Sequence, residues 1–253
     1  MDANTLYLEL LKRSLTDTLH GREPDPAAGM QRFMLDFIRH YVPERAITML
    51  PRARLDHLQA CVEDVLERGV PGDLLEAGVW RGGAVALMRG VLAVHGVTDR
   101  VVWGADSFEG LPEPDAARFP REAAAHDGPV LRDALQNLAV GADQVRANIA
   151  RFGLLDAQVQ LLPGWFGESL PRAPLQRLAL LRVDCDFYQS TRDVLESLYD
   201  KVSPGGHVII DDYAEDEWTH CRQAVDEFRA ERGITEPLRA VDGRCYAWQR
   251  TES

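Results

Sequence analysis

Four aspartates that follow two apolar segments are the residues best placed to do chemistry in this chain. Two come directly after residues 178–183 and two directly after residues 207–210; they are Asp184, Asp186, Asp211 and Asp212. Both segments are typical of buried strands in a parallel sheet, whose carboxyl ends meet at one edge. Carboxylates gathered there repel one another and are costly to bury, and a hard divalent cation such as Mg²⁺ relieves that cost.

The expected cation ligands are Asp184, Asp211 and Asp212, because Mg²⁺ accepts carboxylate oxygens whereas Zn²⁺ more often recruits Cys or His. A bound cation stabilises a deprotonated hydroxyl, and Asp186 is the expected general base that takes the proton. His126 is a second candidate base. Either aspartate pair alone would also fit a solvated turn or a helix cap. Two such pairs at neighbouring strand ends favour the metal site.

A glycine-containing turn follows the first predicted strand and is the candidate cofactor turn. It includes Gly78, Val79 and Trp80, and glycine there lets a ligand approach the backbone closely. Because Trp80 stands two positions after Gly78, the turn is not the G-x-G-x-x-G motif that holds a dinucleotide pyrophosphate. S-adenosylmethionine is a candidate ligand for such a turn, because it has no phosphate and offers an ammonium and a carboxylate instead. Glu76 is expected to bind its ammonium group directly or through water.

An acidic residue at the end of the second predicted strand is suited to a ribose. Asp106, followed by Ser107, stands a little over 20 residues past the glycine turn, where a ribose diol is held in related sheets. A helix cap is the structural alternative for Asp106. The turn and the acid together favour an adenosine-containing ligand.

Strands and helices alternate from about residue 74, which predicts a Rossmann-like α/β fold with helices on both faces of a mostly parallel sheet. Periodicity does not reveal the strand order. The predicted strands are Leu74–Gly78, Val101–Ala105, Val159–Leu162, Leu178–Val183 and His207–Ile210. The predicted helices lie over residues 6–15, 33–41, 55–66, 81–94, 190–199 and 219–230, with another that ends near residue 152.

The domain organisation is expected to be a single domain over residues 1–253, with an N-terminal helical cap over residues 1–50. Residues 113–138 interrupt the alternation, because they combine prolines and glycine with small and charged residues. A long irregular segment after a strand is often a lid over a site, and a surface excursion is the alternative.

Composition restricts the possible partners. The chain has 253 residues and a net charge of −12, which disfavours binding to nucleic acid. There is no run of about 20 apolar residues, no secretory signal and no Cys spacing typical of zinc. The expected protein is cytoplasmic, does not bind membranes and acts on a small molecule. Its apolar N-terminal helices are expected either to cover the site or to pair with another subunit, and a homo-oligomer is favoured.

Several segments resemble the macrocin O-methyltransferase (TylF-type) family over nearly the whole chain. They are Leu6–Leu11, Cys61–Leu66, Pro71–Gly83, Ala105–Gly110, Leu162–Phe166 and Ile209–Tyr213. The resemblance implies a class I methyltransferase sheet, Mg²⁺ at the three aspartates named above, and Thr48, Met49 and Trp165 near the cofactor. The chain departs from the family at Ala77, where Thr is common, and it matches poorly over residues 113–138.

The sequence and the resemblance together predict an S-adenosylmethionine- and Mg²⁺-dependent O-methyltransferase. The resemblance implies that the acceptor is a deoxysugar hydroxyl on an antibiotic glycoside or a nucleotide-sugar. Two alternatives stay open: a metal-dependent catechol or phenol O-methyltransferase, and a non-catalytic nucleotide-binding scaffold. The missing dinucleotide motif disfavours an NAD-dependent oxidoreductase.

Overall fold

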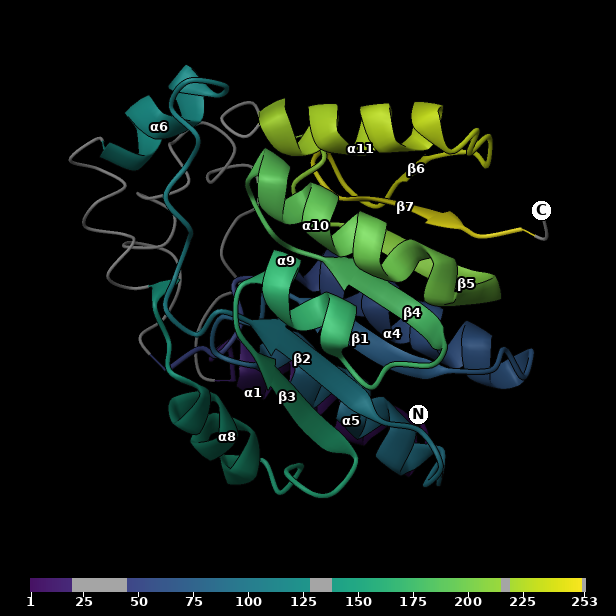
Figure 1. Ribbon diagram of the computed structural model, residues 1–253. Helices are drawn as coiled ribbons and strands as arrows, with labels where there is room; N and C mark the ends of the chain where they lie inside the picture. The colour runs from purple at the N-terminus through teal and green to yellow at the C-terminus, as the bar shows by residue number, and fades with distance from the viewer. Residues whose placement is uncertain (20–44, 128–137, 215–218, 252–253) are drawn as a thin grey trace.

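Seven strands form one sheet at the centre of the molecule, in the order β3-β2-β1-β4-β5-β7-β6 (Figure 1). The computed structural model describes residues 1–19, 45–127, 138–214 and 219–251. Strands β1 to β5 are parallel, whereas β7 is antiparallel to β5 and β6 is antiparallel to β7. The strands are β1 (Asp73–Ala77), β2 (Val102–Asp106), β3 (Val159–Pro163), β4 (Leu178–Val183), β5 (Val202–Ile210), β6 (Arg239–Ala240) and β7 (Tyr246–Gln249).

Helices cover both faces of the sheet (Figure 1). One face carries α1 (Ala3–Leu15), α4 (Arg52–Glu67), α5 (Gly83–Val94) and α8 (Ala142–Arg151). The other carries α9 (Phe166–Ser169), α10 (Tyr188–Leu198), α11 (Thr219–Glu231) and the short 3₁₀ turns η1 (Leu170–Arg172) and η2 (Tyr199–Lys201). Among the helices that the structure describes, none is long and apolar enough to cross a membrane.

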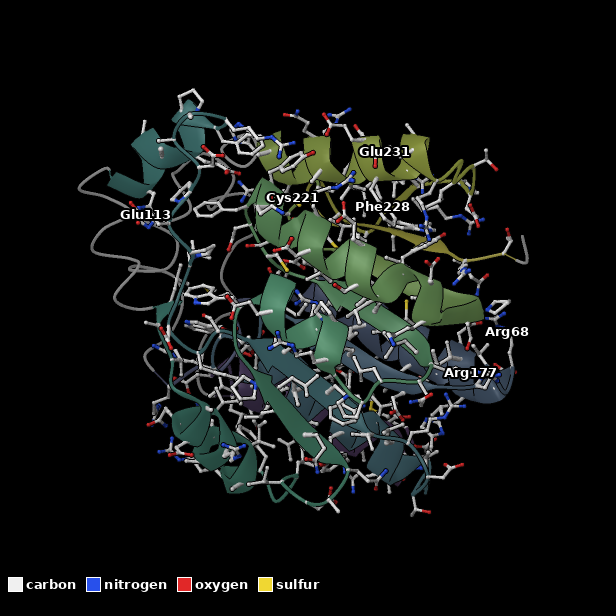
Figure 2. The ribbon with its side chains drawn as sticks, viewed as in Figure 1. Arg68, Glu113, Arg177, Cys221, Phe228 and Glu231 are labelled. Atoms are coloured by element: carbon white, nitrogen blue, oxygen red, sulfur yellow. The ribbon has the colours of Figure 1, made fainter. Side chains whose placement is uncertain are left out.

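Strand β4 is buried along its whole length because it lies in the middle of the sheet. Leu180 packs with the core on the α4 and α5 side, and Leu181 with the core on the α10 and α11 side. In Figure 2, Cys221 and Phe228 lie where α11 faces α10, and both side chains are buried. Alternation along β4 therefore divides the apolar side chains between two cores, one on each side of the sheet.

The predicted Rossmann-like α/β sheet is confirmed, with differences at its C-terminal edge. Strand β5 begins at Val202 and not at His207, because the strand passes through the turn-forming residues Pro204, Gly205 and Gly206 with a shift in pairing register. Strands β6 and β7 were not predicted. Both are short and come after α11, where the parallel alternation ends, so the pattern carried no signal for them.

The composition of residues 113–138 predicts an irregular insertion. Part of it is regular, because it contains helix α6 (Pro120–Asp127). Three consecutive alanines favour a helix there. The carboxylate of Asp115 also accepts hydrogen bonds from the amides of Ala117 and Arg118, which orders the approach to α6. Residues 128–137 of the insertion, and the helix predicted over 33–41, lie outside the described residues.

The order of the strands fixes where a ligand can bind. Strand β1 lies between β2 and β4, so the chain leaves β1 in one direction and later returns to its other side. Ligands in such sheets bind at the carboxyl ends of the strands where this reversal occurs. At that point the backbone of Gly78 adopts a φ of 88°, and a Cβ added to it would lie 1.7 Å from the carbonyl oxygen of Asp184.

Replacing Gly78 with alanine is predicted to destabilise the fold strongly. A left-handed conformation costs about 1–2 kcal/mol in any residue with a Cβ, and at Gly78 the backbone clash adds to it. Gly96 is the matched control, since its φ is 67° and a Cβ there would meet nothing within 4 Å. Urea unfolding should show a clearly larger loss for Gly78→Ala than for Gly96→Ala. Equal losses would contradict the close approach of the two strand ends.

Candidate active site

A cavity of about 380 Å³ opens at the carboxyl ends of β1, β2 and β4. The insertion forms one wall of it, and Glu113 of that wall lies at the side of the molecule that carries α6 (Figure 2). Eight residues that the sequence predicts as cofactor-binding or catalytic line the cavity. They are Met49, Gly78, Trp80, Asp106, Ser107, Trp165, Asp184 and Asp186.

Asp106 ties the end of β2 to the turn after β1. One oxygen accepts a hydrogen bond from the amide of Val79 at 2.6 Å, and the other accepts one from the amide of Phe108 at 2.8 Å. Burial raises the pKa of the Asp106 carboxyl, although the amides that donate to it act in the opposite direction. Asp106, which is predicted to hold a ribose, therefore also shapes the turn by accepting backbone hydrogen bonds, as a capping residue does.

Two bulky residues beside Asp106 hold an uncommon backbone conformation. Trp80 has a φ of 45° and Phe108 a φ of 58°. Such strain persists only where the surrounding contacts impose it, and it is concentrated at functional sites. The guanidinium of Arg81 lies 4.3 Å from the centre of the Trp80 ring and donates to the carbonyl of Ala46 at 2.8 Å. The turn is thus clamped to the segment that precedes α4.

That segment brings Thr48 and Met49 to the cofactor turn, as the family resemblance implies. A Cβ added to Gly83 would lie 2.5 Å from the Cβ of Thr48, so the segment packs directly on the start of α5. The hydroxyl of Thr48 is buried and accepts a hydrogen bond from the amide of Leu50. Met49, between them, lines the cavity.

The three predicted metal ligands lie together. Asp184, Asp211 and Asp212 each offer a carboxylate oxygen within 4.8 Å of the others. Asp211 and Asp212 are buried, and Asp184 is partly exposed at the cavity. The amide of Asp186 donates to a carboxylate oxygen of Asp212 at 3.3 Å, which brings the predicted base to the same group.

A buried arginine, Arg182, contacts two members of this cluster and the neighbouring Glu76. The Nη1 atom of Arg182 donates to Glu76 at 2.6 Å and to Asp184 at 2.7 Å, and its Nη2 atom donates to Asp211 at 2.6 Å. Arg182 is 2% exposed. Its pKa is raised well above the usual value by the facing carboxylates, with Asp211 the strongest, although burial acts in the opposite direction.

A second arginine binds the far side of Asp211. Arg54, from α4, donates to Asp211 at 2.5 Å and to Asp242 at 2.7 Å. Asp242 in turn accepts hydrogen bonds from the amides of Arg244 and Cys245 before β7. Both oxygens of Asp211 are therefore fixed by guanidinium groups that come from opposite sides.

The donor set of the group fits a hard divalent cation. Arg182 and Arg54 together contact four carboxylates, those of Glu76, Asp184, Asp211 and Asp242, and Asp212 lies beside Asp184 and Asp211. Burial raises the pKa of Glu76 to about 8 and also raises that of Asp184, and in both cases the charge of Arg182 opposes the shift. Three carboxylate oxygens within reach of one ion are ligands of the kind that Mg²⁺ binds.

Six of the predicted site residues do not line the cavity, namely Thr48, Glu76, Val79, His126, Asp211 and Asp212. Glu76 lies among the buried charges, where its Oε1 accepts from Arg182 and its Oε2 has no hydrogen-bond partner among the described residues. His126 lies in the last turn of α6, with its ring centre 6.4 Å from that of Phe187. Both assignments stay predictions, and neither residue is placed at the cavity wall.

Sequence reasoning missed Arg182 and Arg54, which pair with the predicted metal ligands, and Asp242, which pairs with Arg54. Arg182 carried a usable signal, because it is charged within an apolar strand and stands two residues before Asp184, on the same face. Arg54 carried none, since it reaches Asp211 from 157 positions away in the chain. Glu122, a buried carboxylate of α6, also carried no local signal, because its partner Tyr188 is distant in the chain.

Comparison with known proteins assigns a family to this geometry. Residues 39–250 match the Macrocin-O-methyltransferase (TylF) family. The chain is 49% identical over 258 residues to demethyldecarbamoylnovobiocin O-methyltransferase of Streptomyces niveus, covering 98% of this chain and 94% of the relative. It is 47% identical over 260 residues to the 8-demethyl-8-(2,3-dimethoxy-alpha-L-rhamnosyl)-tetracenomycin-C 4'-O-methyltransferase of Streptomyces olivaceus, covering 99% and 94%. Among solved structures, the O-methyltransferase NovP is 42% identical, with a TM-score of 0.86 over 98% of this chain and 100% of NovP.

Replacing Arg182 with methionine is predicted to destabilise the protein by about 3–5 kcal/mol, because removing one partner leaves buried carboxylates uncompensated. Arg68→Met is the control, since Arg68 pairs with Asp64 at the surface and such a pair contributes about 1 kcal/mol or less. Urea unfolding at neutral pH measures both. The buried network has no structural role of this size if the two variants unfold at the same urea concentration.

Proposed function

The chain belongs to the macrocin O-methyltransferase family and is an O-methyltransferase, and on that premise we propose that it methylates a deoxysugar hydroxyl with S-adenosylmethionine and Mg²⁺. The observation that carries the proposal is the carboxylate cluster of Asp184, Asp211 and Asp212, which reaches, through Asp184, a cavity that also borders the Gly78 turn. Methyl donor and acceptor hydroxyl would meet there. The family assignment excludes a non-catalytic scaffold.

The cofactor is proposed to lie along the first two strand ends. Trp80, Asp106, Ser107 and Trp165 line that part of the cavity, which suits an adenosine. The methionine part would lie toward the Gly78 turn, and Glu76 would bind its ammonium group through water, because it does not reach the cavity wall itself. The carboxylates of Glu76 and Asp106 also suit a cofactor that carries positive charge on its ammonium and sulfonium groups.

Asp186 is proposed to be the general base of the methyl transfer. When bound by Asp184, Asp211 and Asp212, Mg²⁺ supplies positive charge that favours the deprotonated form of a nearby hydroxyl. Asp186 lines the cavity beside this cluster and would accept the proton of the acceptor hydroxyl. Arg182 and Arg54 keep Asp211 in place, so that the carboxylates do not need to reorganise when the acceptor arrives.

The acceptor is proposed to be a glycoside and not a nucleotide-sugar. Glu113, Asp115, Glu122, Asp186 and Asp193 line the cavity, and no Lys or Arg is among its described lining residues. Carboxylates repel a diphosphate, whereas an uncharged glycoside meets no such barrier. The tetracenomycin relative is named for a rhamnosyl-bearing substrate, in agreement with a sugar acceptor.

A homo-oligomer stays a prediction. Its support is the outer face of α1, where Leu6 and Leu10 are each more than half exposed. Exposed apolar side chains that gather on one helix face are typical of a contact between subunits.

An acceptor screen tests the proposed function directly. We expect mass spectrometry to show one added methyl group on a deoxysugar glycoside, and far slower transfer to a nucleotide-sugar with the same sugar. A catechol serves as the third arm, for the alternative phenol methyltransferase. Preferred methylation of the nucleotide-sugar would overturn the charge argument, and methylation of the catechol alone would overturn the sugar assignment.

Methyl transfer is predicted to require a divalent cation. Excess chelator should abolish turnover, and added Mg²⁺ should restore it. Asp212→Asn should reduce turnover by more than the ~10- to 100-fold that typically follows loss of a ligand's supporting partner, while calorimetry shows nearly unchanged binding of S-adenosylhomocysteine. Asp212 is chosen over Asp211 because Asp211 also pairs with both arginines. Full turnover in chelator would remove the metal from the proposal.

A further inference from the structure

The backbone that carries the proposed base is a strained turn. Asp186 has a φ of 56°, and the amide of Phe187 donates to the carbonyl of Cys185 at 2.6 Å. A hydrogen bond between residues two apart, around a centre with positive φ, defines a γ-turn of the rare and strained kind. Such a turn persists only when surrounding contacts impose it. The contacts that impose this one decide where the Asp186 carboxylate lies.

One of these contacts comes from the insertion. The turn leads directly into α10, whose N-cap residue, Phe187, makes no side-chain capping bond. The cap is supplied instead by Glu122 of α6, whose Oε1 accepts a hydrogen bond from the amide of Tyr188 at 2.9 Å. A carboxylate at a helix N-terminus is favoured by the helix dipole. The carboxylate of Glu122 therefore holds the residue that stands two positions after Asp186.

Glu122 is built into its place. It is 3% exposed, lines the cavity, and lies 3.5 Å from Nδ1 of His220. The ring of Phe119, three residues earlier, packs on the Tyr188 ring with centres 4.6 Å apart. The hydroxyl of Tyr188 donates in turn to Glu227 of α11. The start of α6 is thereby joined to α10 and α11 beside the strained turn.

We propose that Glu122 is a positioning residue, through which the insertion holds the turn around Asp186 in its productive shape. The inference rests on the proposed role of Asp186 as the base. Glu122 itself takes no proton from the acceptor. Its contribution is the hydrogen bond that its Oε1 atom accepts from the Tyr188 amide. The cavity wall formed by α6 and the backbone that carries Asp186 are therefore held together by this hydrogen bond.

Two substitutions show whether Glu122 acts as a hydrogen-bond acceptor or through its negative charge. Glu122→Ala removes the acceptor of the Tyr188 amide and should lower kcat by about 10- to 100-fold, the range expected when a reacting group is misplaced. The KM for the cofactor should change little. Glu122→Gln keeps an Oε1 acceptor without the charge and should restore kcat to nearly the wild-type value. Glu196→Ala is the control on the exposed side of α10, and it should leave kcat unchanged.

Hydrogen exchange tests the geometry without any turnover. In Glu122→Ala, amides in a peptide covering residues 184–190 should exchange faster than in the wild type, and in Glu122→Gln they should not. The proposal is overturned if Glu122→Ala keeps normal kcat and exchange, or if Glu122→Gln is as impaired as Glu122→Ala. A wild-type protein that methylates no acceptor would instead refute the proposed function, and the exchange comparison would still decide the role of Glu122.

Discussion

The contact between Arg182 and three carboxylates is the interaction on which the rest of the site depends. One guanidinium group, buried in the middle of the sheet, donates to Glu76, Asp184 and Asp211 at 2.6 to 2.7 Å. These three residues belong to or follow three adjacent strands, β1, β4 and β5, so the same group that compensates their charge also fixes the spacing of the strand ends. Arg54 extends this control to α4 and to the loop before β7. The orientation of the acidic groups is thus set by the core and not by the cavity.

The strand order explains why Asp184 of this charged group and the Gly78 turn line one cavity. The Gly78 turn contacts the end of β4 so closely that a side chain at Gly78 would overlap the backbone of Asp184. Glycine here brings two functional segments into contact, one suited to a cofactor and one to a cation. The insertion completes the cavity and also contacts the start of α10 through Glu122. Three segments that are distant in sequence, namely the Gly78 turn, the end of β4 and the insertion, therefore meet at this cavity.

The residues that end strands could be predicted from the sequence, and the residues that cross between layers could not. Asp184, Asp211 and Asp212 were predicted together because carboxyl ends of parallel strands must meet, and the structure brings them together. Arg182 was recognisable in principle, as a charge inside an apolar strand. Arg54 and Glu122 reach the site from helices, and their partners follow from tertiary packing, which no local pattern encodes. Strand β7 and helix α6 were missed for a different reason, since each lies where the alternation of strands and helices is interrupted.

The central claim is that Arg182 and the sheet hold Asp184, Asp211 and Asp212 as one site for a divalent cation. A titration with Mn²⁺, followed by electron paramagnetic resonance in the presence of S-adenosylhomocysteine, tests it most directly. The account predicts one saturable Mn²⁺ per chain, displaced by Mg²⁺ and lost in Asp184→Asn. Absence of saturable binding in the wild type, or unchanged binding in Asp184→Asn, would contradict it.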